Sequence, residues 1–89
     1  MHILYFSAEW CGSCKMMKPA FAKFVEEMKD SITHEIVDVE SNSELSMQYN
    51  VRNIPAFVFV KDGKEVERLI GARPTSEFKT IVTKYESQN

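Results

Sequence analysis

Hydrophobic residues recur along the chain with two different periods, and polar turns separate the segments that carry them. His2–Ser7 is mostly apolar on both faces, as is typical of a strand buried between two layers. Ser13–Lys29 repeats apolar residues at three- and four-residue spacing, which predicts an amphipathic helix. The expected buried stripe of this helix is Met17, Phe21, Phe24, Val25 and Met28. Thr33–Val39 predicts a second strand, so the chain opens with a strand–helix–strand unit.

The middle of the chain contains shorter elements. Ser43–Asn50 predicts a short helix, and Ser41 or Ser43 is its expected N-terminal cap, because a hydroxyl oxygen accepts from free N–H groups there. Ala56–Val60 is a strongly apolar strand that directly follows Pro55. A proline is tolerated at the start of a strand, since it has no N–H to donate. The spacing alone leaves the isomer of the bond before this proline open.

A hairpin and a final helix complete the predicted elements. The tight-turn sequence Lys61–Lys64 joins the apolar strand to a further strand over Glu65–Ile70. A last helix follows Pro74, and Glu86–Asn89 is expected to fray. The inward-facing residues of that helix are Phe78, Ile81, Val82 and Tyr85.

The predicted order of elements is β-α-β-α-β-β-α, which places the chain in the α/β class. The first two strands should be parallel and joined by a right-handed crossover helix, whereas the hairpin adds antiparallel strands. We therefore expect a four-stranded mixed sheet flanked by three helices. A length of 89 residues fits one domain over residues 1–89.

Charge and composition exclude several classes of function. The formal net charge of −2 gives no electrostatic support for nucleic-acid binding. No apolar run approaches the length of a membrane span, and the first residues lack the pattern of a secretory signal. The cytoplasm is therefore the expected compartment, where a two-cysteine disulfide is more typical of catalysis than of structure.

The reactive side chains are concentrated at the junction between the first strand and the first helix. Cys11 and Cys14 are the only cysteines, and Trp10 is the only tryptophan. A helix N-terminus lowers the pKa of a cysteine, because free N–H groups and the helix dipole stabilise the thiolate. Cys11 is expected at or just before the first turn, ionised and exposed, with Cys14 one turn later and better covered. The two thiols are placed to form and break one disulfide, with Cys14 as the resolving thiol.

Two other uses of the cysteine pair remain open. The pair is also half of a zinc ligand set, but His2 and His34 are the only imidazoles and form no paired motif. A purely structural disulfide is the second alternative, although so short a loop contributes little through chain entropy. Neither histidine is next to a cysteine, which argues against a protease-like Cys–His nucleophile. No glycine-rich nucleotide motif is present, and we expect no cofactor and no metal.

Several motifs, in this order, resemble the thioredoxin family. They are Ala8–Lys15 with Met16 and Pro19, then Ile54-Pro55, Lys61-Asp62-Gly63 and Gly71. The resemblance covers nearly the whole chain and implies a thioredoxin-like fold. It implies that Cys11 is the nucleophile and that Cys14 resolves the mixed disulfide. It also implies that Pro55 is cis and lies against the disulfide.

The same resemblance implies a thiol–disulfide oxidoreductase that reduces protein disulfides through a Cys11/Cys14 dithiol–disulfide cycle. The implied substrate-binding residues are Trp10, Gly12, Ser13, Ile54, Pro55, Gly71 and Ala72, with Ile54 offering backbone hydrogen bonds to an extended substrate. The implied partners are disulfide-containing proteins and an electron donor, either a thioredoxin-reductase-like protein or a small thiol. We expect a monomer without nucleic-acid or membrane partners.

The sequence departs from the family pattern in several places. The family's first strand and helix are missing, so Thr33–Val39 is expected at an edge of the sheet. Tyr5 stands where the family has a buried Asp, and Ile36 where it often has a buried Lys. Asp38 is the nearest candidate to replace that Asp beside the resolving thiol. Ser13 stands where the family's Gly-Pro dipeptide has its proline.

Two alternatives to the thioredoxin reading come from different classes. A glutaredoxin-like, glutathione-linked oxidoreductase has about this length, but its usual Cys-Pro-Tyr-Cys motif is absent. Its double glycine is absent too, since Gly71 is followed by Ala72. A non-catalytic binding module with a thioredoxin-like fold would use the same face to dock a partner, without a need for both cysteines.

Overall fold

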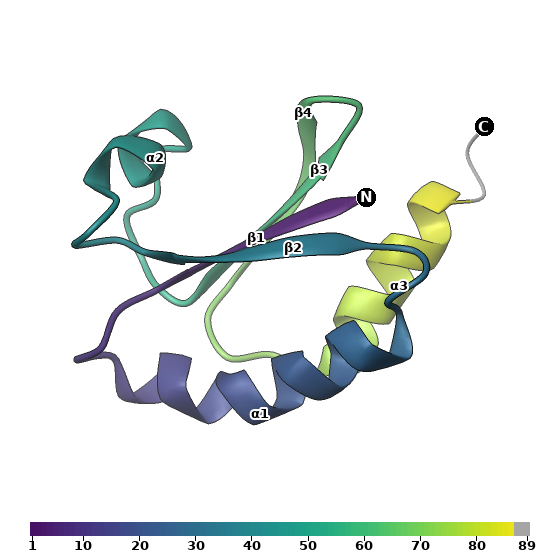
Figure 1. The fold of residues 1–89 in the computed structure, drawn as a ribbon, viewed down its shortest axis with the longest axis horizontal. Coiled ribbons are helices and arrows are strands. Elements are labelled where there is room, and N and C mark those ends of the chain that lie inside the picture. Colours follow the sequence, from purple (N-terminus) through teal and green to yellow (C-terminus); the bar gives the residue numbers. More distant parts are fainter. Residues whose placement is uncertain (87–89) are drawn as a thin grey trace.

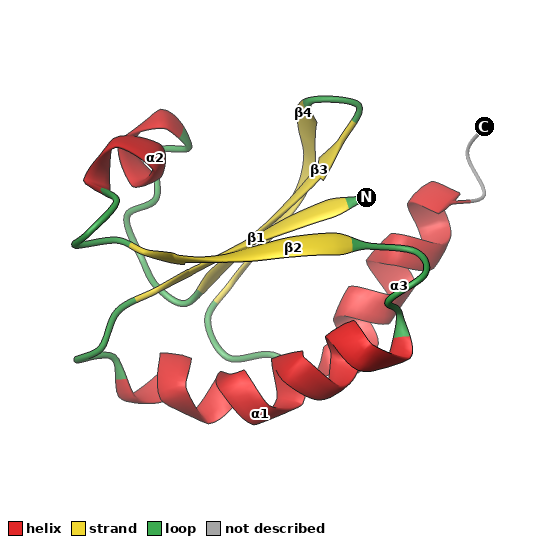
Figure 2. Cartoon of the chain, in the orientation of Figure 1, coloured by secondary structure: helices red, strands yellow, loops and turns green. Residues whose placement is uncertain are grey.

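The computed structural model describes residues 1–86, in which four strands and three helices follow the predicted order (Figure 1 and Figure 2). They are β1 His2–Ser7, α1 Gly12–Glu27, β2 Thr33–Asp38, α2 Ser43–Gln48, β3 Ala56–Lys61, β4 Lys64–Ile70 and α3 Thr75–Glu86. The fraying expected for Glu86–Asn89 concerns mainly residues 87–89, which lie outside the described part of the chain. None of the helices within residues 1–86 combines the length and apolar character that a membrane span requires.

The four strands form one mixed sheet with the spatial order β2-β1-β3-β4. β1 and β2 are parallel, with α1 as the crossover, whereas β3 is antiparallel to both β1 and β4. α1 and α3 cover one face of the sheet, and α2 lies on the other (Figure 1). β2 is an edge strand, as predicted, and its Glu35 is exposed. A charged side chain on an edge discourages pairing with another sheet.

The alternation of side chains along β1 divides the core between the two faces. Ile3 and Tyr5 belong to the cluster beneath α1 and α3, whereas Leu4 and Phe6 belong to the cluster beneath α2. All four are buried, and Tyr5 is fully covered. β1 is therefore the central strand of both cores, which fits its run of apolar residues without polar alternation.

The core beneath α1 and α3 is an aromatic cluster centred on Phe78 of α3. The ring centroid of Phe78 lies 4.5 Å from that of Phe57 on β3 and 5.4 Å from that of Phe24 on α1. The centroids of Phe59 and Phe21 are 6.0 and 6.3 Å away. The predicted stripes of α1 and α3 thus meet on the sheet, and they hold the helix that carries the cysteines.

The N-terminal cap of α2 is not the residue that the sequence suggested. The prediction of Ser41 or Ser43 is wrong, because Asn42 is the cap and its side-chain oxygen accepts from the backbone N–H of Leu45. Ser43 is already the first helical residue, and Ser41 lies in the preceding turn. Leu45 and Tyr49 pack against the second core cluster, as predicted.

The β3–β4 hairpin turns through two residues, as its sequence predicts. Asp62 has φ 54° and Gly63 has φ 79°. A two-residue turn with positive φ at both positions matches the twist of the flanking strands, and Asp-Gly is among the pairs that adopt it at the lowest cost. This turn fixes the register in which β4 pairs with β3 and so places the loop that follows β4.

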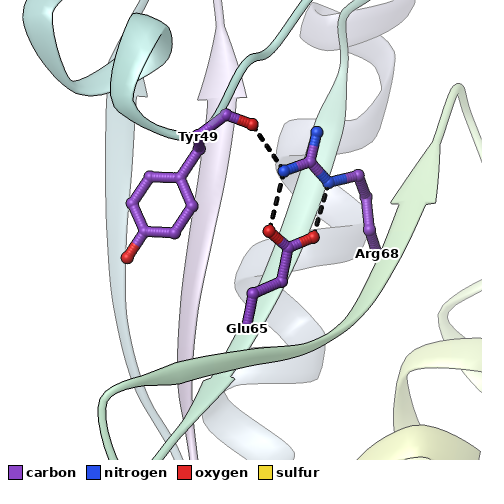
Figure 3. Close-up of polar contacts among 3 residues, drawn as sticks. All are labelled: Tyr49, Glu65 and Arg68. Atoms are coloured by element: carbon purple, nitrogen blue, oxygen red, sulfur yellow. Dashed lines mark hydrogen bonds and ion pairs between the residues drawn. The ribbon is translucent and has the colours of Figure 1, made fainter.

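Arg68 on β4 connects the hairpin to the C-terminal end of α2 (Figure 3). Its guanidinium donates to both carboxylate oxygens of Glu65, at 2.7 and 2.8 Å, and to the carbonyl oxygen of Tyr49 at 2.6 Å. Tyr49 is the C-cap residue of α2, where carbonyl groups lack helical partners. Arg68 pairs with Val58 in the register, so it covers the sheet face that α2 occupies.

We expect Arg68→Ala to lower the free energy of unfolding by about 1–2 kcal/mol, because it removes charge-assisted bonds from a half-buried side chain. Urea unfolding measures this loss. Arg73→Ala is the matched control, since it removes only exposed contacts, a pair in which Nη1 lies 3.3 Å from Oε1 of Glu77 and a bond from Nε to the Ile70 carbonyl oxygen at 3.2 Å. Such pairs contribute well under about 1 kcal/mol. Equal losses in the two variants would contradict the role given to Arg68.

Candidate active site

The two cysteines form a disulfide at the N-terminal end of α1, with their Cα atoms 5.2 Å apart. Cys11 is the N-cap residue, and the backbone N–H of Cys14 donates to its sulfur at 3.2 Å. The N–H of Cys11 itself donates to the carbonyl oxygen of Ala8 at 3.2 Å, which closes the turn after β1. The expectation that Cys11 lies just before the first turn is confirmed. Its sulfur occupies the place where the free N–H groups of the helix converge.

The two cysteines differ less in exposure to solvent than the sequence suggests. Cys14 is fully buried, and Cys11 is 6% exposed. The prediction of an exposed Cys11 is therefore wrong in degree, because Ala8, Val39 and Ile54 pack against the two cysteines. Cys11 remains the more accessible of the two.

Two further loops meet the cysteines at the same end of the sheet. Ile54 packs against the cysteine cluster, and the Ile54–Pro55 bond is cis, as the resemblance implies. Pro55 is buried, and its carbonyl oxygen accepts from the N–H of Gly71 at 2.8 Å. Gly71 has φ 90°, a conformation that residues with a Cβ rarely adopt, and Ala72 beyond it is exposed. The loops before β3 and after β4 are thus joined beside the disulfide.

The third segment at this end is the loop between β1 and α1 together with the first residues of α1, and it exposes Trp10, Gly12 and Ser13. Trp10 is 67% exposed, and its indole N–H donates to the carboxylate of Glu40. The Ser13 hydroxyl lies 3.5 Å from the Cys11 sulfur. The sequence reasoning did not single out Glu40, because it lies after β2 and only the fold brings it to Trp10. An indole at the surface, fixed at its nitrogen, offers a flat apolar contact beside the disulfide.

Tyr5 is the residue that touches Cys14 from the sheet. Its hydroxyl donates to the Cys14 carbonyl oxygen at 2.6 Å, and burial raises its pKa to about 12. The hydroxyl therefore stays protonated near neutral pH and keeps the proton that it donates to Cys14. Strand alternation placed Tyr5 on the α1 face, but the contact itself depends on the distance between β1 and α1.

Asp38, the residue suggested by the sequence as a neighbour of the resolving thiol, has a different set of contacts. Its Oδ1 accepts from the backbone N–H groups of Glu40 and Ser41, at 2.8 and 3.2 Å. These bonds form the turn after β2, as aspartate side chains commonly do. Asp38 therefore holds the segment that carries Glu40, the partner of Trp10.

A zinc site would need further ligands beside the two cysteines, and the part of the chain that the structure describes does not supply them. Among residues 1–86, no three His, Cys, Asp or Glu side chains are grouped so that they would hold a metal ion. Structural zinc sites need four such ligands. The two sulfurs are instead joined to each other.

Fold and site together define the class. A disulfide between residues three apart, at a helix N-terminus and against a mixed sheet of this topology, makes this a thiol–disulfide oxidoreductase domain. The family model described as Thioredoxin matches residues 1–84. The chain belongs to the thioredoxin family.

Similar proteins support this assignment at moderate identity. A thioredoxin H-type of Oryza sativa subsp. indica is 38% identical over 80 residues, which cover 90% of this chain and 65% of the rice protein. The thioredoxin of Bacillus subtilis (strain 168) is 36% identical over 80 residues, which cover 90% of this chain and 77% of that protein. The chain thus spans only part of the length of these relatives.

Solved structures agree with the fold. The oxidised mitochondrial thioredoxin 3 of Saccharomyces cerevisiae superposes with a TM-score of 0.82 at 35% identity, over 90% of this chain and 74% of that one. The thioredoxin of Fasciola hepatica gives 0.84 at 38% identity, over 92% and 78%. The predicted thioredoxin-like fold is confirmed. The family match also favours the thioredoxin reading over the glutaredoxin-like and binding-module alternatives.

Proposed function

We propose that this chain reduces disulfide bonds in other proteins through a Cys11/Cys14 dithiol–disulfide cycle. The Cys11 thiolate attacks a substrate disulfide, bonds to one substrate sulfur and displaces the other as a thiolate. Cys14 then attacks the Cys11 sulfur and displaces the remaining substrate sulfur. Two electrons pass to the substrate, and the chain is left with the Cys11–Cys14 disulfide.

The observation that carries this proposal is the position of the Cys11 sulfur as the N-cap acceptor of α1. The Cys14 N–H points at it from 3.2 Å, and the first turn of α1 contains no acidic residue to oppose a negative charge. Both features stabilise a thiolate at Cys11. The small exposure of Cys11 and the complete burial of Cys14 support attack by Cys11 and resolution by Cys14.

The substrate surface that we propose comprises the three loops around the disulfide and the first residues of α1. It consists of Trp10, Gly12, Ser13, Ile54, Pro55, Gly71 and Ala72. The exposed indole of Trp10 supports this assignment, as does the free space on the side of Gly12 where a Cβ would lie. An extended substrate segment would lie across the disulfide, with the backbone of Ile54 beside it.

The cycle requires a donor that returns electrons to the disulfide. Thioredoxins in general act on disulfide substrates and are reduced by a thioredoxin reductase, and we propose such a reductase or a small thiol as the donor here. We further propose that residues 1–89 act as one domain in electron transport in the cytoplasm, where the glutathione pool keeps thiols reduced. The solved yeast relative is mitochondrial, so a fractionation experiment decides the compartment.

The reduction potential of the Cys11–Cys14 pair tests the proposal. Trp10 is the only tryptophan and lies beside the disulfide, so its fluorescence in defined thiol buffers reports the redox state. A potential at or below the glutathione poise of about −220 to −260 mV supports a reductase. A potential far above this range would assign an oxidant or isomerase, and the absence of a reversible disulfide would overturn the proposed chemistry.

A substitution at Ser13 should change the reduction potential of the Cys11–Cys14 pair in a direction that can be predicted. We expect Ser13→Pro to raise the Cys11 pKa, because proline removes one backbone donor from the first turn of α1. Loss of about one hydrogen bond to the thiolate corresponds to a potential that is more negative by about 20 mV. Thiol-buffer titration measures the potential, and the pH dependence of alkylation measures the pKa.

Ser13→Ala is the control for this substitution, because it removes the hydroxyl at 3.5 Å from the Cys11 sulfur but keeps the N–H. A shift confined to Ser13→Pro assigns the effect to the backbone donor. An unchanged or lowered Cys11 pKa in Ser13→Pro would refute the account.

A further inference from the structure

Tyr5 is a buried titratable side chain that has no role in the proposed thiol–disulfide cycle. It lies on the central strand, paired with Ile36 on one side and Phe57 on the other. Its ring packs between two phenylalanines, with its centroid 4.8 Å from that of Phe21 and 4.6 Å from that of Phe57. Strand pairing and ring packing leave the hydroxyl little freedom to move.

The Tyr5 hydroxyl reaches the backbone of the resolving cysteine. It donates to the carbonyl oxygen of Cys14 at 2.6 Å, across the space between β1 and α1. Cys14 is fully buried, so its sulfur is placed by the backbone that carries it. The hydrogen bond fixes that backbone against the sheet.

We propose that Tyr5 is a positioning residue for the second half of the exchange, holding Cys14 so that its sulfur stays within reach of the Cys11 sulfur. This inference rests on the proposed function. In the resolving step the Cys14 thiol loses its proton to solvent, and its sulfur bonds to Cys11. The bond between Cys11 and the substrate breaks, and the substrate sulfur leaves with the electron pair as a thiolate. Tyr5 keeps its proton throughout.

The surroundings of Cys14 contain no buried group that would take its proton. Among residues 1–86, no Asp, Glu, His, Lys or Arg side chain is buried. The charged residues on the elements around the disulfide are Glu9, Lys15, Lys18, Asp38, Glu40, Arg52 and Arg73, and all of them reach solvent. The proton of Cys14 therefore leaves towards water, and the sheet contributes position alone.

Tyr5→Phe tests this role, because it keeps the packed ring and removes only the hydroxyl. The reduced protein is mixed with 5,5′-dithiobis(2-nitrobenzoate), and the coloured thiol is followed by stopped flow. The first equivalent reports attack by Cys11, and the second reports resolution by Cys14. We expect an unchanged first phase and a second phase slowed about three- to tenfold, the effect of one lost hydrogen bond on a well-placed reactant.

Tyr85→Phe is the matched control. Its hydroxyl lies within hydrogen-bond distance of two acceptors on the hairpin, the Val66 carbonyl oxygen at 3.0 Å and Oε2 of Glu67 at 3.1 Å, and neither is beside the cysteines. This variant loses a comparable hydrogen bond and should keep both phases. All rates are measured at a temperature at which each variant is fully folded.

The pH profile of the second phase separates positioning from proton transfer. In Tyr5→Phe we expect the rate of the second phase to be lower by the same factor at every pH, with the inflection of the profile at an unchanged pH. A shifted or lost inflection, or a second phase as fast as that of the unchanged protein, overturns the inference. If the unchanged protein releases no second equivalent, the proposed function itself fails, whatever Tyr5 does.

Discussion

Cys14→Ser is expected to stop the reaction halfway and to leave the protein covalently attached to its substrate. Cys11 keeps its place as the N-cap acceptor of α1, so its thiolate still attacks a disulfide. The serine hydroxyl cannot resolve the mixed disulfide, because it is far less ionised and less nucleophilic than a thiol. Incubation with insulin should therefore give a stable adduct, seen by mass spectrometry and released by a reducing agent.

Cys11→Ser should instead give no adduct and no reduction above the uncatalysed rate. The remaining Cys14 is fully buried, so a substrate disulfide cannot reach it. The pair of variants thus forms its own control, since both lack one thiol and only one of them should trap substrate. An adduct formed by Cys11→Ser as readily as by Cys14→Ser would reverse the roles assigned to the two cysteines.

Phe78→Ala is expected to lower the free energy of unfolding by about 3–5 kcal/mol, the usual loss for a buried phenylalanine. The Phe78 ring is fully covered and contacts aromatic rings from both α1 and β3. Two of the surrounding rings are on the paired strand β3 and two are on α1, and these packed elements keep them from collapsing into the cavity. A domain of this size has about 5–15 kcal/mol in total, so the variant should be close to unfolding at 37 °C.

Thermal unfolding followed by circular dichroism measures this loss, and two further variants interpret it. Phe78→Leu keeps most of the volume and should lose much less stability. Met47→Ala removes a side chain that is 77% exposed and should change the unfolding free energy by no more than about 0.5 kcal/mol. If Phe78→Ala were as stable as Met47→Ala, the aromatic cluster would not be the main core.

The sequence predicts the elements well because the hydrophobic period is unambiguous in most of them. Three patterns each fit only one kind of element. The apolar stripe of α1 fits a helix, the apolar run of β1 fits a buried strand, and Asp62-Gly63 fits a hairpin turn. The cap of α2 was missed, because neighbouring serine and asparagine residues are almost equally good caps and the end of β2 decides among them. The cis bond before Pro55 followed from the family resemblance and not from the local sequence.

The candidate site was predicted less completely than the fold. The positions of Cys11 and Cys14 follow from their spacing and from the start of α1. The near-burial of Cys11 and the contact of Trp10 with Glu40 depend on loops that meet only after folding. The contact of Tyr5 with Cys14 likewise joins a strand to a helix, and no local pattern encodes the distance between them.

The sulfur that carries out the chemistry is also the cap of α1, and this double use couples redox state to folding. Reduction removes a cross-link that closes a very short loop, and it turns the cap into a charged and therefore stronger acceptor. The unfolded chain has the same two thiols but no helix end to stabilise the thiolate. In the closed cycle of folding and reduction, the difference in unfolding free energy between the two redox forms must equal the difference between the folded and unfolded potentials multiplied by the charge of the two electrons transferred. Any substitution at the N-terminal end of α1 that makes the protein a stronger oxidant will therefore stabilise its reduced form relative to its oxidised form. Two unfolding curves, one for each redox form, give the difference between the folded and unfolded potentials.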